Sequence, residues 1–372
     1  MKLLWLSPNH NHYKAKFLNY LHNDTTVDVS VLAGGGRKGM GDVESNEDID
    51  YQIYRFGVDK SRFGYSKLIR KHLRSVFNDF DWVLIPREKK NFLLIMYAVA
   101  LRFLNRIKGG ETRLVTYNHP YSTTQGSKIT MLDKLITKLF YQLYDKVIFY
   151  TEKSYQQAIR DKVVNKSKAY WANNTIDTKA IEKVYSFVVP NRSPSHILFI
   201  GRLIPSKNVN GCIEFCAKLK SMIQTHGGDL ELTIIGDGPD ANIVKSKMEM
   251  YNWISWKGAL IEEKDISTYM RNAAIVFVPG LSGLSINHAF CYGRPYATFS
   301  SKNHGPEIGY LSNGVNGFIL DSSEQENLRT FAEFLLSSSS ELYYNANDTG
   351  KMLSVENWCR NFEKALLNES ID

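Results

Sequence analysis

Two segments in the second half of the chain place cationic and small residues at the ends of apolar runs. Residues 199–208 read Phe-Ile-Gly-Arg-Leu-Ile-Pro-Ser-Lys-Asn, so Arg202 stands at a predicted strand end and Lys207 where a helix would begin. Residues 279–285 read Pro-Gly-Leu-Ser-Gly-Leu-Ser and follow a second apolar run. Two cations and the free N–H groups of a helix start favour binding of an anion such as a diphosphate. The pattern indicates a phosphate-bearing ligand, with an ordinary βα connection as the alternative.

The second segment is expected to turn from a strand directly into a helix. Ser282 and Gly283 would open that helix, because serine can cap free N–H groups and glycine has no Cβ atom. Gly293 would end the helix, and Pro295 would begin the next strand. Backbone donors at such a turn point toward whatever lies above the sheet.

Both segments resemble motifs of the retaining GT-B glycosyltransferases, in the large family-four type (glycosyltransferase group 1) that includes sucrose and mannosyl transferases. Its donor segment reads approximately Pro-Ser-x-x-Glu-Gly-Phe-Gly-Leu-x-x-x-Glu-Ala-x-Ala-x-Gly-x-Pro. Residues 282–285 cover the Phe-Gly-Leu part, and residues 288–295 cover the rest. Residues 201–208 match the family's Gly-Arg-Leu-x-x-x-Lys-(Gly/Asn), whose arginine and lysine grip the donor diphosphate. The chain departs from the family at the two glutamates, separated by seven residues, which fall on Gly280 and His288.

Strands and helices alternate along most of the chain, which predicts parallel sheets covered by helices. At 372 residues the chain exceeds what one hydrophobic core usually holds, so two domains are expected. The apolar runs that predict strands are residues 3–6, 27–32, 51–56, 81–85, 112–117, 146–150, 196–200, 230–235, 254–256 and 274–278.

The resemblance implies the GT-B architecture, an α/β fold of two Rossmann-like domains facing a central cleft. An acceptor-binding domain would span residues 1–175, and a nucleotide-sugar-binding domain residues 176–355. Residues 356–372 would form a helix that crosses back to the first domain. The boundary rests on residues 172–177, Ala-Asn-Asn-Thr-Ile-Asp, which resemble the family's Asn-Gly-Val-Asp crossing.

The resemblance also assigns roles to individual residues. Arg202 and Lys207 would neutralise the leaving diphosphate, and His119 would face the donor sugar, where a histidine can donate to a hydroxyl or stabilise charge. The donor would be bound by Gly201, Gly238, Leu260, Ser282, Gly283, Leu284, Ser285, His288 and Glu307. His10, His12 and Tyr13, in the first βα loop, would contact the acceptor in place of the family's glycines.

Plain structural roles remain open for several of these residues. His119 and Glu307 could each cap a turn or helix, and His288 could be a buried structural histidine. Gly238 stands in Gly-Asp-Gly-Pro, a good turn sequence in any protein. The loop of His10 and His12 could be solvent-exposed, and a metal site there lacks a third ligand.

Charge is unevenly shared along the chain. Residues 1–175 contain 28 Lys and Arg against 16 Asp and Glu, whereas the remainder is slightly acidic. A basic first half favours anionic lipid headgroups or a lipid-linked diphosphate, or is simply a solvated surface. No segment is expected to span a membrane, since the longest apolar run, residues 92–101, is about half the required length. The four cysteines lack metal-ligand spacing, Cys212 and Cys216 are expected to be buried thiols on a helix, and the compartment is expected to be reducing.

Two further motifs are expected to be incidental. Asp48-Ile-Asp50 resembles the metal-binding aspartate pair of another glycosyltransferase fold, but lies in an acidic loop. Gly34-Gly-Gly-Arg-Lys38 has the spacing of neither the dinucleotide fingerprint nor the P-loop.

The function expected from all this is retaining, metal-independent transfer of a hexosyl group from a nucleotide-sugar to an acceptor hydroxyl. A UDP-sugar is favoured over a GDP-sugar, and the acceptor would be lipid-linked or a saccharide, in bacterial surface polysaccharide or glycolipid assembly. The protein would be cytoplasmic, at the inner face of an anionic membrane, without nucleic acid as a partner. The alternatives are a catalytically inactive binding subunit and a nucleotide-sugar epimerase.

Overall fold

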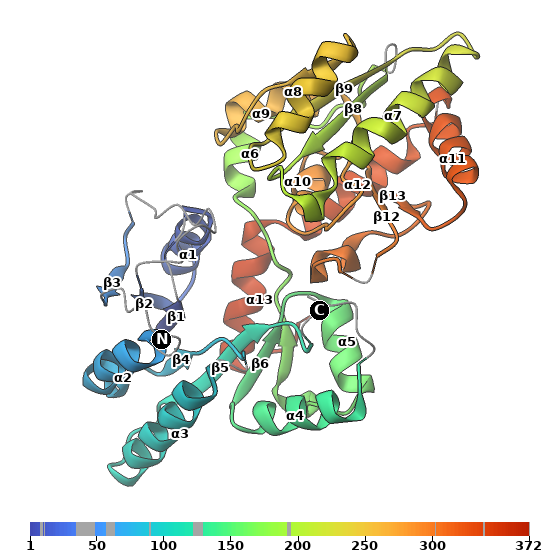
Figure 1. Cartoon of the computed structure of the whole chain (residues 1–372). Coiled ribbons are helices and arrows are strands. Elements are labelled where there is room, and N and C mark those ends of the chain that lie inside the picture. The colour runs from blue at the N-terminus through green and yellow to red at the C-terminus, as the bar shows by residue number, and fades with distance from the viewer. Residues whose placement is uncertain are drawn as a thin grey trace. The chain divides into compact units, whose positions relative to one another are not determined.

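The computed structural model describes most of the chain as two compact units (Figure 1). It covers residues 1–7, 10, 12–34, 49–56, 64–88, 91–121, 129–191, 195–301, 303–337 and 339–371, with the backbone alone at residues 12, 13 and 64–68. Unit 1 holds the described residues of 1–177 and 355–371, and unit 2 those of 178–354.

Unit 1 is built on a seven-stranded parallel sheet in the order β3-β2-β1-β4-β5-β6-β7. Apart from the edge strands β3 and β7, its strands are short and mostly apolar runs buried on both faces, as parallel sheets require. The strands are β1 (Lys2–Ser7), β2 (Asp28–Ala33), β3 (Gln52–Arg55), β4 (Trp82–Leu84), β5 (Arg113–Asn118), β6 (Lys146–Phe149) and β7 (Ala169–Trp171).

Helices cover both faces of this sheet. Leu3 and Trp5 of β1 pack with α1 (His12–Asp24) and α13 (Val355–Leu367), whereas Leu4 and Leu6 point to the opposite core. That opposite core is covered by α2 (Gly64–Val76), α3 (Phe92–Ile107), α4 (Met131–Gln142), α5 (Glu152–Arg160) and the short turn η1 (Phe77–Asp79). The turn η3 (Lys166–Lys168) has no buried residue and leads into β7. The last helix of the chain therefore belongs to unit 1.

Unit 2 is built on a six-stranded parallel sheet in the order β10-β9-β8-β11-β12-β13. From β8 the chain proceeds to one side, through β9 and β10, and from β11 to the other. The topological switch point therefore lies between β8 and β11, where ligands bind in open α/β sheets. The strands are β8 (Ser195–Ile200), β9 (Leu230–Ile235), β10 (Ile254–Trp256), β11 (Ala273–Phe277), β12 (Tyr296–Phe299) and β13 (Gly317–Leu320).

The connections of unit 2 are mostly helical. They are α6 (Thr178–Val184), η4 (Pro205–Lys207), α7 (Val209–Gln224), α8 (Ala241–Met250), α9 (Glu263–Asn272), α10 (Ser285–Cys291), η5 (Pro306–Tyr310), α11 (Glu324–Leu336) and α12 (Glu341–Met352). The alternation expected from the sequence is confirmed in both units, and with it the α/β fold class.

A buried arginine fastens the start of unit 2 to its core. Arg294, which is fully buried, donates through Nε to the Tyr292 carbonyl and through Nη2 to the Tyr185 hydroxyl and the Val188 carbonyl. A buried guanidinium is tolerated only when its donors are satisfied in this way. Arg294 therefore ties residues 185–188 to the end of α10.

Candidate functional site

The structure brings the two motif segments together at the switch point of unit 2. The segment after β8 and the segment after β11 pair through their backbones, with Leu281 N–H donating to the Ser206 carbonyl (2.7 Å) and Gly280 N–H to the Lys207 carbonyl (3.2 Å). The parallel register of β8 with β11 places both strand ends at the same edge of the sheet. The candidate site is defined here as residues 201–207, 280–285 and 304–307 at that edge.

Lys207 is the most perturbed cation of the site. Burial is the main cause that lowers its pKa to about 8, nearby Arg202 lowers the pKa further, and Glu307 raises it. Lys207 closes η4 and directly precedes Asn208, which caps α7 through a bond from Gly211 N–H (3.1 Å). Two cations held together at a strand end have an unfavourable interaction that a bound anion would relieve.

Glycines let the loops at this edge approach one another closely. A Cβ atom at Gly236 would lie 1.9 Å from the Gly201 carbonyl oxygen, and one at Gly238 would lie 2.4 Å from the Leu203 carbonyl oxygen. Both residues have φ values, 142° and 153°, that favour glycine. Gly201 lies beside Lys207, since its Cβ position would be 3.7 Å from Lys207 Cε. The close approach of the Leu203 carbonyl therefore explains the glycine at position 238 without any ligand.

The close backbone pairing explains why position 280 holds glycine in this chain. A Cβ atom there would lie 2.2 Å from the Ser206 carbonyl oxygen and 2.6 Å from the Lys207 carbonyl carbon. Contacts under about 3 Å with backbone atoms require the backbone to move. A glutamate at position 280 is therefore incompatible with the way these two loops pack.

Ser282 does not cap the following helix, contrary to the sequence expectation. Helix α10 begins at Ser285, and Leu284 precedes it without a side-chain cap. The fully buried Ser282 Oγ instead donates to the Gly280 carbonyl (3.3 Å) or to Thr298 Oγ1 (3.1 Å) and accepts from the Tyr296 hydroxyl (3.1 Å). Neighbouring Ser285 also contacts the Tyr296 hydroxyl (2.8 Å). These hydroxyls fix the shape of the loop from within.

His304 holds the same loop from the other side, and sequence reasoning gave it no role. Its Nδ1 accepts from Ser282 N–H (3.1 Å), and its Nε2 donates to the Phe299 carbonyl (2.8 Å). These two bonds require the neutral ring with the proton on Nε2. Burial and nearby Lys207 lower the pKa of His304, whereas the bond to Phe299 raises it. The only sequence signal was its place three residues before Glu307.

Acid should therefore loosen this loop. Because the folded-state pKa of His304 lies below its ordinary 6.5, the stability it contributes is present above pH 6.5 and is lost as the pH falls through the folded value. His304→Asn keeps an acceptor for Ser282 N–H and cannot titrate. We expect the drop in Tm between about pH 7.5 and about pH 5 to be smaller in this variant than in the wild type. Equal drops would contradict the role of His304.

Glu307 contributes a buried carboxylate next to the glycines of the site. It is 6% exposed, and its Oε2 lies 3.8 Å from the Cβ position of Gly283 and 2.6 Å from that of Gly305. Gly305 N–H donates to the Ser282 carbonyl (2.7 Å). Together with the electrostatic attraction to Lys207, these positions place Glu307 inside the candidate site.

His288 is paired with an acid that the sequence did not single out. Its Nε2 lies 3.0 Å from Glu263 Oε2, at the start of α9, and the Tyr292 hydroxyl donates to the same oxygen (2.8 Å). Both side chains of the His288–Glu263 pair are largely buried. The motif position that carries a glutamate in the family thus contacts a carboxylate supplied by another helix. Leu260, in the loop between β10 and α9, is half-buried.

His119 lies at the carboxyl end of β5 in unit 1, not in unit 2. Its Nδ1 contacts the Tyr121 carbonyl, which can only accept, so Nδ1 carries the proton. Burial is the main cause that lowers the pKa of His119. The neutral ring then offers Nε2 as an acceptor, whereas the sequence analysis expected a donor.

The three residues expected to contact the acceptor differ in how far the structure describes them. His10 is 2% exposed, and its Nε2 lies 2.6 Å from the Tyr51 hydroxyl, so it is a packed residue of unit 1. The side chains of His12 and Tyr13 lie outside the described part of the chain, although His12 begins α1.

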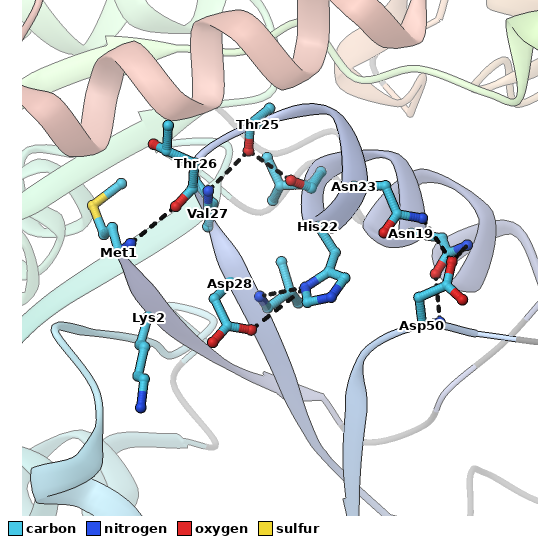
Figure 2. Close-up of polar contacts among 12 residues, drawn as sticks. Met1, Lys2, Asn19, His22, Asn23, Thr25, Thr26, Val27, Asp28 and Asp50 are labelled. Atoms are coloured by element: carbon cyan, nitrogen blue, oxygen red, sulfur yellow. Dashed lines mark hydrogen bonds and ion pairs between the residues drawn. The ribbon is translucent and has the colours of Figure 1, made fainter.

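Asp50, the second aspartate of Asp48-Ile-Asp50, has structural partners. Asn23 and Asn19 donate to its Oδ2 (2.6 and 3.1 Å), and its own N–H donates to Asn19 Oδ1 (2.9 Å), as Figure 2 shows. These hydrogen bonds lower the pKa of Asp50. Asp48 and residues 35–38 lie outside the described residues. Among the described residues, no group of three His, Cys, Asp or Glu side chains could hold a metal ion.

Comparisons with known proteins find a family model that matches part of the chain and solved structures that share its fold. Residues 194–338 match the family model described as Glycosyl transferases group 1. No curated protein sequence matches the chain. Among solved structures, the lipopolysaccharide outer core galactosyltransferase WaaB is 12% identical with a TM-score of 0.67, over 99% of both chains.

Two further structures are similar over nearly their full lengths. Anabaena HepE in complex with UDP is 15% identical, with a TM-score of 0.67, over 99% of this chain and 100% of HepE. Sucrose-phosphate synthase from Thermosynechococcus elongatus is 11% identical, with a TM-score of 0.68, over 98% of both chains. Residues 194–338, in unit 2, therefore match the group 1 glycosyltransferase model, and the whole chain shares the GT-B fold of these structures.

Proposed function

We propose that unit 2 binds a nucleoside-diphosphate-sugar at the candidate site and that the enzyme transfers the sugar, with retention, to an acceptor hydroxyl. The observation that carries this proposal is the meeting of the two motif segments at the switch point of the sheet, which brings Arg202 and half-buried Lys207 to the same edge as the loop before α10. Burial and neighbouring Arg202 disfavour the charged form of Lys207, and a bound diphosphate would favour it, as at sites that hold an anion.

In the proposed reaction, Arg202 and Lys207 stabilise the negative charge that develops on the departing diphosphate. Backbone N–H groups at residues 283–285 would add to this stabilisation, since the first N–H groups of a helix lack intrahelical partners. The leaving phosphate then accepts the proton of the acceptor hydroxyl as the new glycosidic bond forms on the same face of the sugar. The two protein cations would supply the charge that a metal supplies in other transferases.

We propose UDP as the nucleotide and a lipid-linked or saccharide hydroxyl as the acceptor. The HepE structures contain UDP or UDP-glucose, which supports the choice of nucleotide. WaaB is a lipopolysaccharide outer core galactosyltransferase, which supports a role in surface polysaccharide or glycolipid assembly. His119, at the end of β5 in unit 1, is proposed to accept a hydrogen bond from a donor-sugar hydroxyl.

The proposal is tested by thermal unfolding against a panel of nucleoside diphosphates and nucleotide-sugars. A ligand at about 100 times its Kd stabilises the protein by roughly 2.7 kcal/mol, which for unit 2 corresponds to a rise in Tm of roughly 5 °C or more. The rise should be largest for UDP compounds and reduced to roughly half or less in Arg202→Ala and Lys207→Ala. A matched control is Lys218→Ala, which removes an exposed lysine paired with Glu324 on the same unit. An unchanged Tm with every nucleotide would refute the proposal.

A catalytically inactive binding subunit is the second candidate, favoured by the absence of both motif glutamates. The structure of the two positions weakens this argument, because the space at Gly280 is filled by the loop after β8 and His288 is paired with Glu263. Slow hydrolysis of the bound UDP-sugar, measured as UDP release, separates the candidates without knowledge of the acceptor. UDP binding with no hydrolysis and no transfer to any acceptor would favour the inactive subunit.

A further inference from the structure

Two neighbouring helices of unit 1 expose large apolar side chains along their outer faces. On α3 the exposed positions 92, 96, 103 and 107 are spaced by four, seven and four residues, and positions 93 and 104 adjoin them. At 3.6 residues per turn, these six positions lie on one face of the helix. The residues are Phe92 (47% exposed), Leu93 (51%), Met96 (41%), Phe103 (65%), Leu104 (54%) and Ile107 (67%). A surface helix normally has a polar outer face. A helix that packs on a core with one face and is apolar on the other therefore has a second surface that an apolar partner can bury.

Helix α4 continues the same kind of surface. Met131 is 81% exposed, Leu132 63%, and Leu135 and Leu139 each 54%. The two helices are consecutive crossovers on the same face of the sheet (Figure 1). Phe92 of α3 contacts Phe140 of α4, with ring centroids 5.8 Å apart. The outer faces of α3 and α4 are called the apolar face below. Large apolar side chains that gather on the exposed face of a helix mark an interaction site.

The charges around the apolar face identify its partner. Helix α3 contains no acidic residue, and the single acid of α4, Asp133, forms the capping box with Thr130. Exposed Lys108 and Lys138 lie at the end of or within the apolar stripes, and exposed Arg106 forms an ion pair with Asp145 (3.6 Å). Neighbouring α2 likewise contains four basic residues and no acid, with Lys71 and Arg74 exposed. Apolar side chains interleaved with lysine and arginine match an anionic bilayer surface, where the former enter the interface and the latter meet headgroups.

We propose that the apolar face of α3 and α4 docks unit 1 onto an anionic lipid bilayer as a peripheral contact. Among the described residues, no helix is both long and apolar enough to span a bilayer. The proposal goes beyond donor binding, because it concerns a surface of unit 1 that shares no residue with the candidate site of unit 2.

The test is flotation of the full chain with vesicles, without nucleotide. Vesicles of phosphatidylcholine with about one quarter phosphatidylglycerol should retain the wild type, whereas vesicles of phosphatidylcholine alone, or high salt, should retain much less. Phe103→Ser with Ile107→Ser should lower the partition coefficient at least about tenfold, because two large apolar side chains no longer enter the bilayer. Lys108→Glu with Lys138→Glu should weaken binding to the anionic vesicles alone.

The control removes two apolar side chains of similar exposure from unit 2. Met250 is 66% exposed and Met352 63%, so Met250→Ser with Met352→Ser should leave vesicle binding unchanged. All variants should unfold at the wild-type Tm. If the proposed function holds, UDP should also raise the Tm of every variant as it does for the wild type. Loss of donor binding and loss of membrane docking are therefore measured separately. Equal losses in the Phe103/Ile107 and control variants would overturn the proposal. A dimeric wild type and a monomeric Phe103/Ile107 variant would also overturn the proposal, because the apolar face would then be buried against a second copy of the chain.

Discussion

Replacement of Lys207 by methionine is expected to slow UDP release from a UDP-sugar by about 10²- to 10³-fold, the loss typical for removal of one preorganised charge stabiliser. Methionine keeps much of the alkyl volume and removes only the cation. The unliganded protein should be no less stable than the wild type, since burial and Arg202 already oppose the charged form of Lys207.

Two controls separate loss of charge from loss of structure. Lys218→Met removes a lysine whose side chain is 54% exposed and should leave UDP release unchanged. Lys207→Arg retains the charge with a longer, planar head and should retain part of the rate. A Lys207→Met enzyme with the wild-type rate would remove the lysine from the proposed mechanism.

Restoring the family's first glutamate by Gly280→Glu is expected to damage the enzyme rather than improve it. The new Cβ would lie 2.2 Å from the Ser206 carbonyl oxygen, so the loop that holds Lys207 must move. We expect the free energy of unfolding to fall by about 3 kcal/mol, at the upper end for overpacking, and UDP binding to weaken with it. Chemical denaturation and the UDP-dependent rise in Tm measure both effects.

Glycine-to-alanine changes supply the matched comparison. Gly280→Ala introduces the same Cβ and should account for most of the destabilisation, whereas Gly283→Ala meets no atom nearer than 3.8 Å and should be tolerated. If Gly280→Glu raised the rate of UDP release, the packing explanation for the missing glutamate would be wrong. His288→Glu would be expected to fail for a different reason, because the new carboxylate would face Glu263.

The fold was predictable because its signals are local. Apolar runs such as residues 196–200 and 274–278 identify buried strands without knowledge of their partners, and β8 and β11 confirm them. The two motif segments also meet as the switch-point topology requires. The parallel α/β class follows from alternation alone.

The inner structure of the site was not predictable, because its contacts join residues distant in sequence. Ser282 was expected to cap α10, but buried partners on β12, Tyr296 and Thr298, compete for its hydroxyl and hold it away from the helix. His304 acts through a bond to a backbone N–H 22 residues earlier, which no side-chain pattern reveals. Glu263 reaches His288 from 25 residues away on another helix.

The most direct test of the account is the affinity for UDP, measured by titration calorimetry at about pH 7 and about pH 9 in the wild type and in Lys207→Met. Lys207 is protonated below its pKa of about 8, and a bound diphosphate raises that pKa, so binding takes up a proton at high pH. The wild type should bind UDP roughly tenfold more weakly at the higher pH, whereas Lys207→Met should bind weakly at both. Equal wild-type affinity at both pH values, or unimpaired binding by Lys207→Met, would contradict the central claim that Lys207 grips the donor diphosphate.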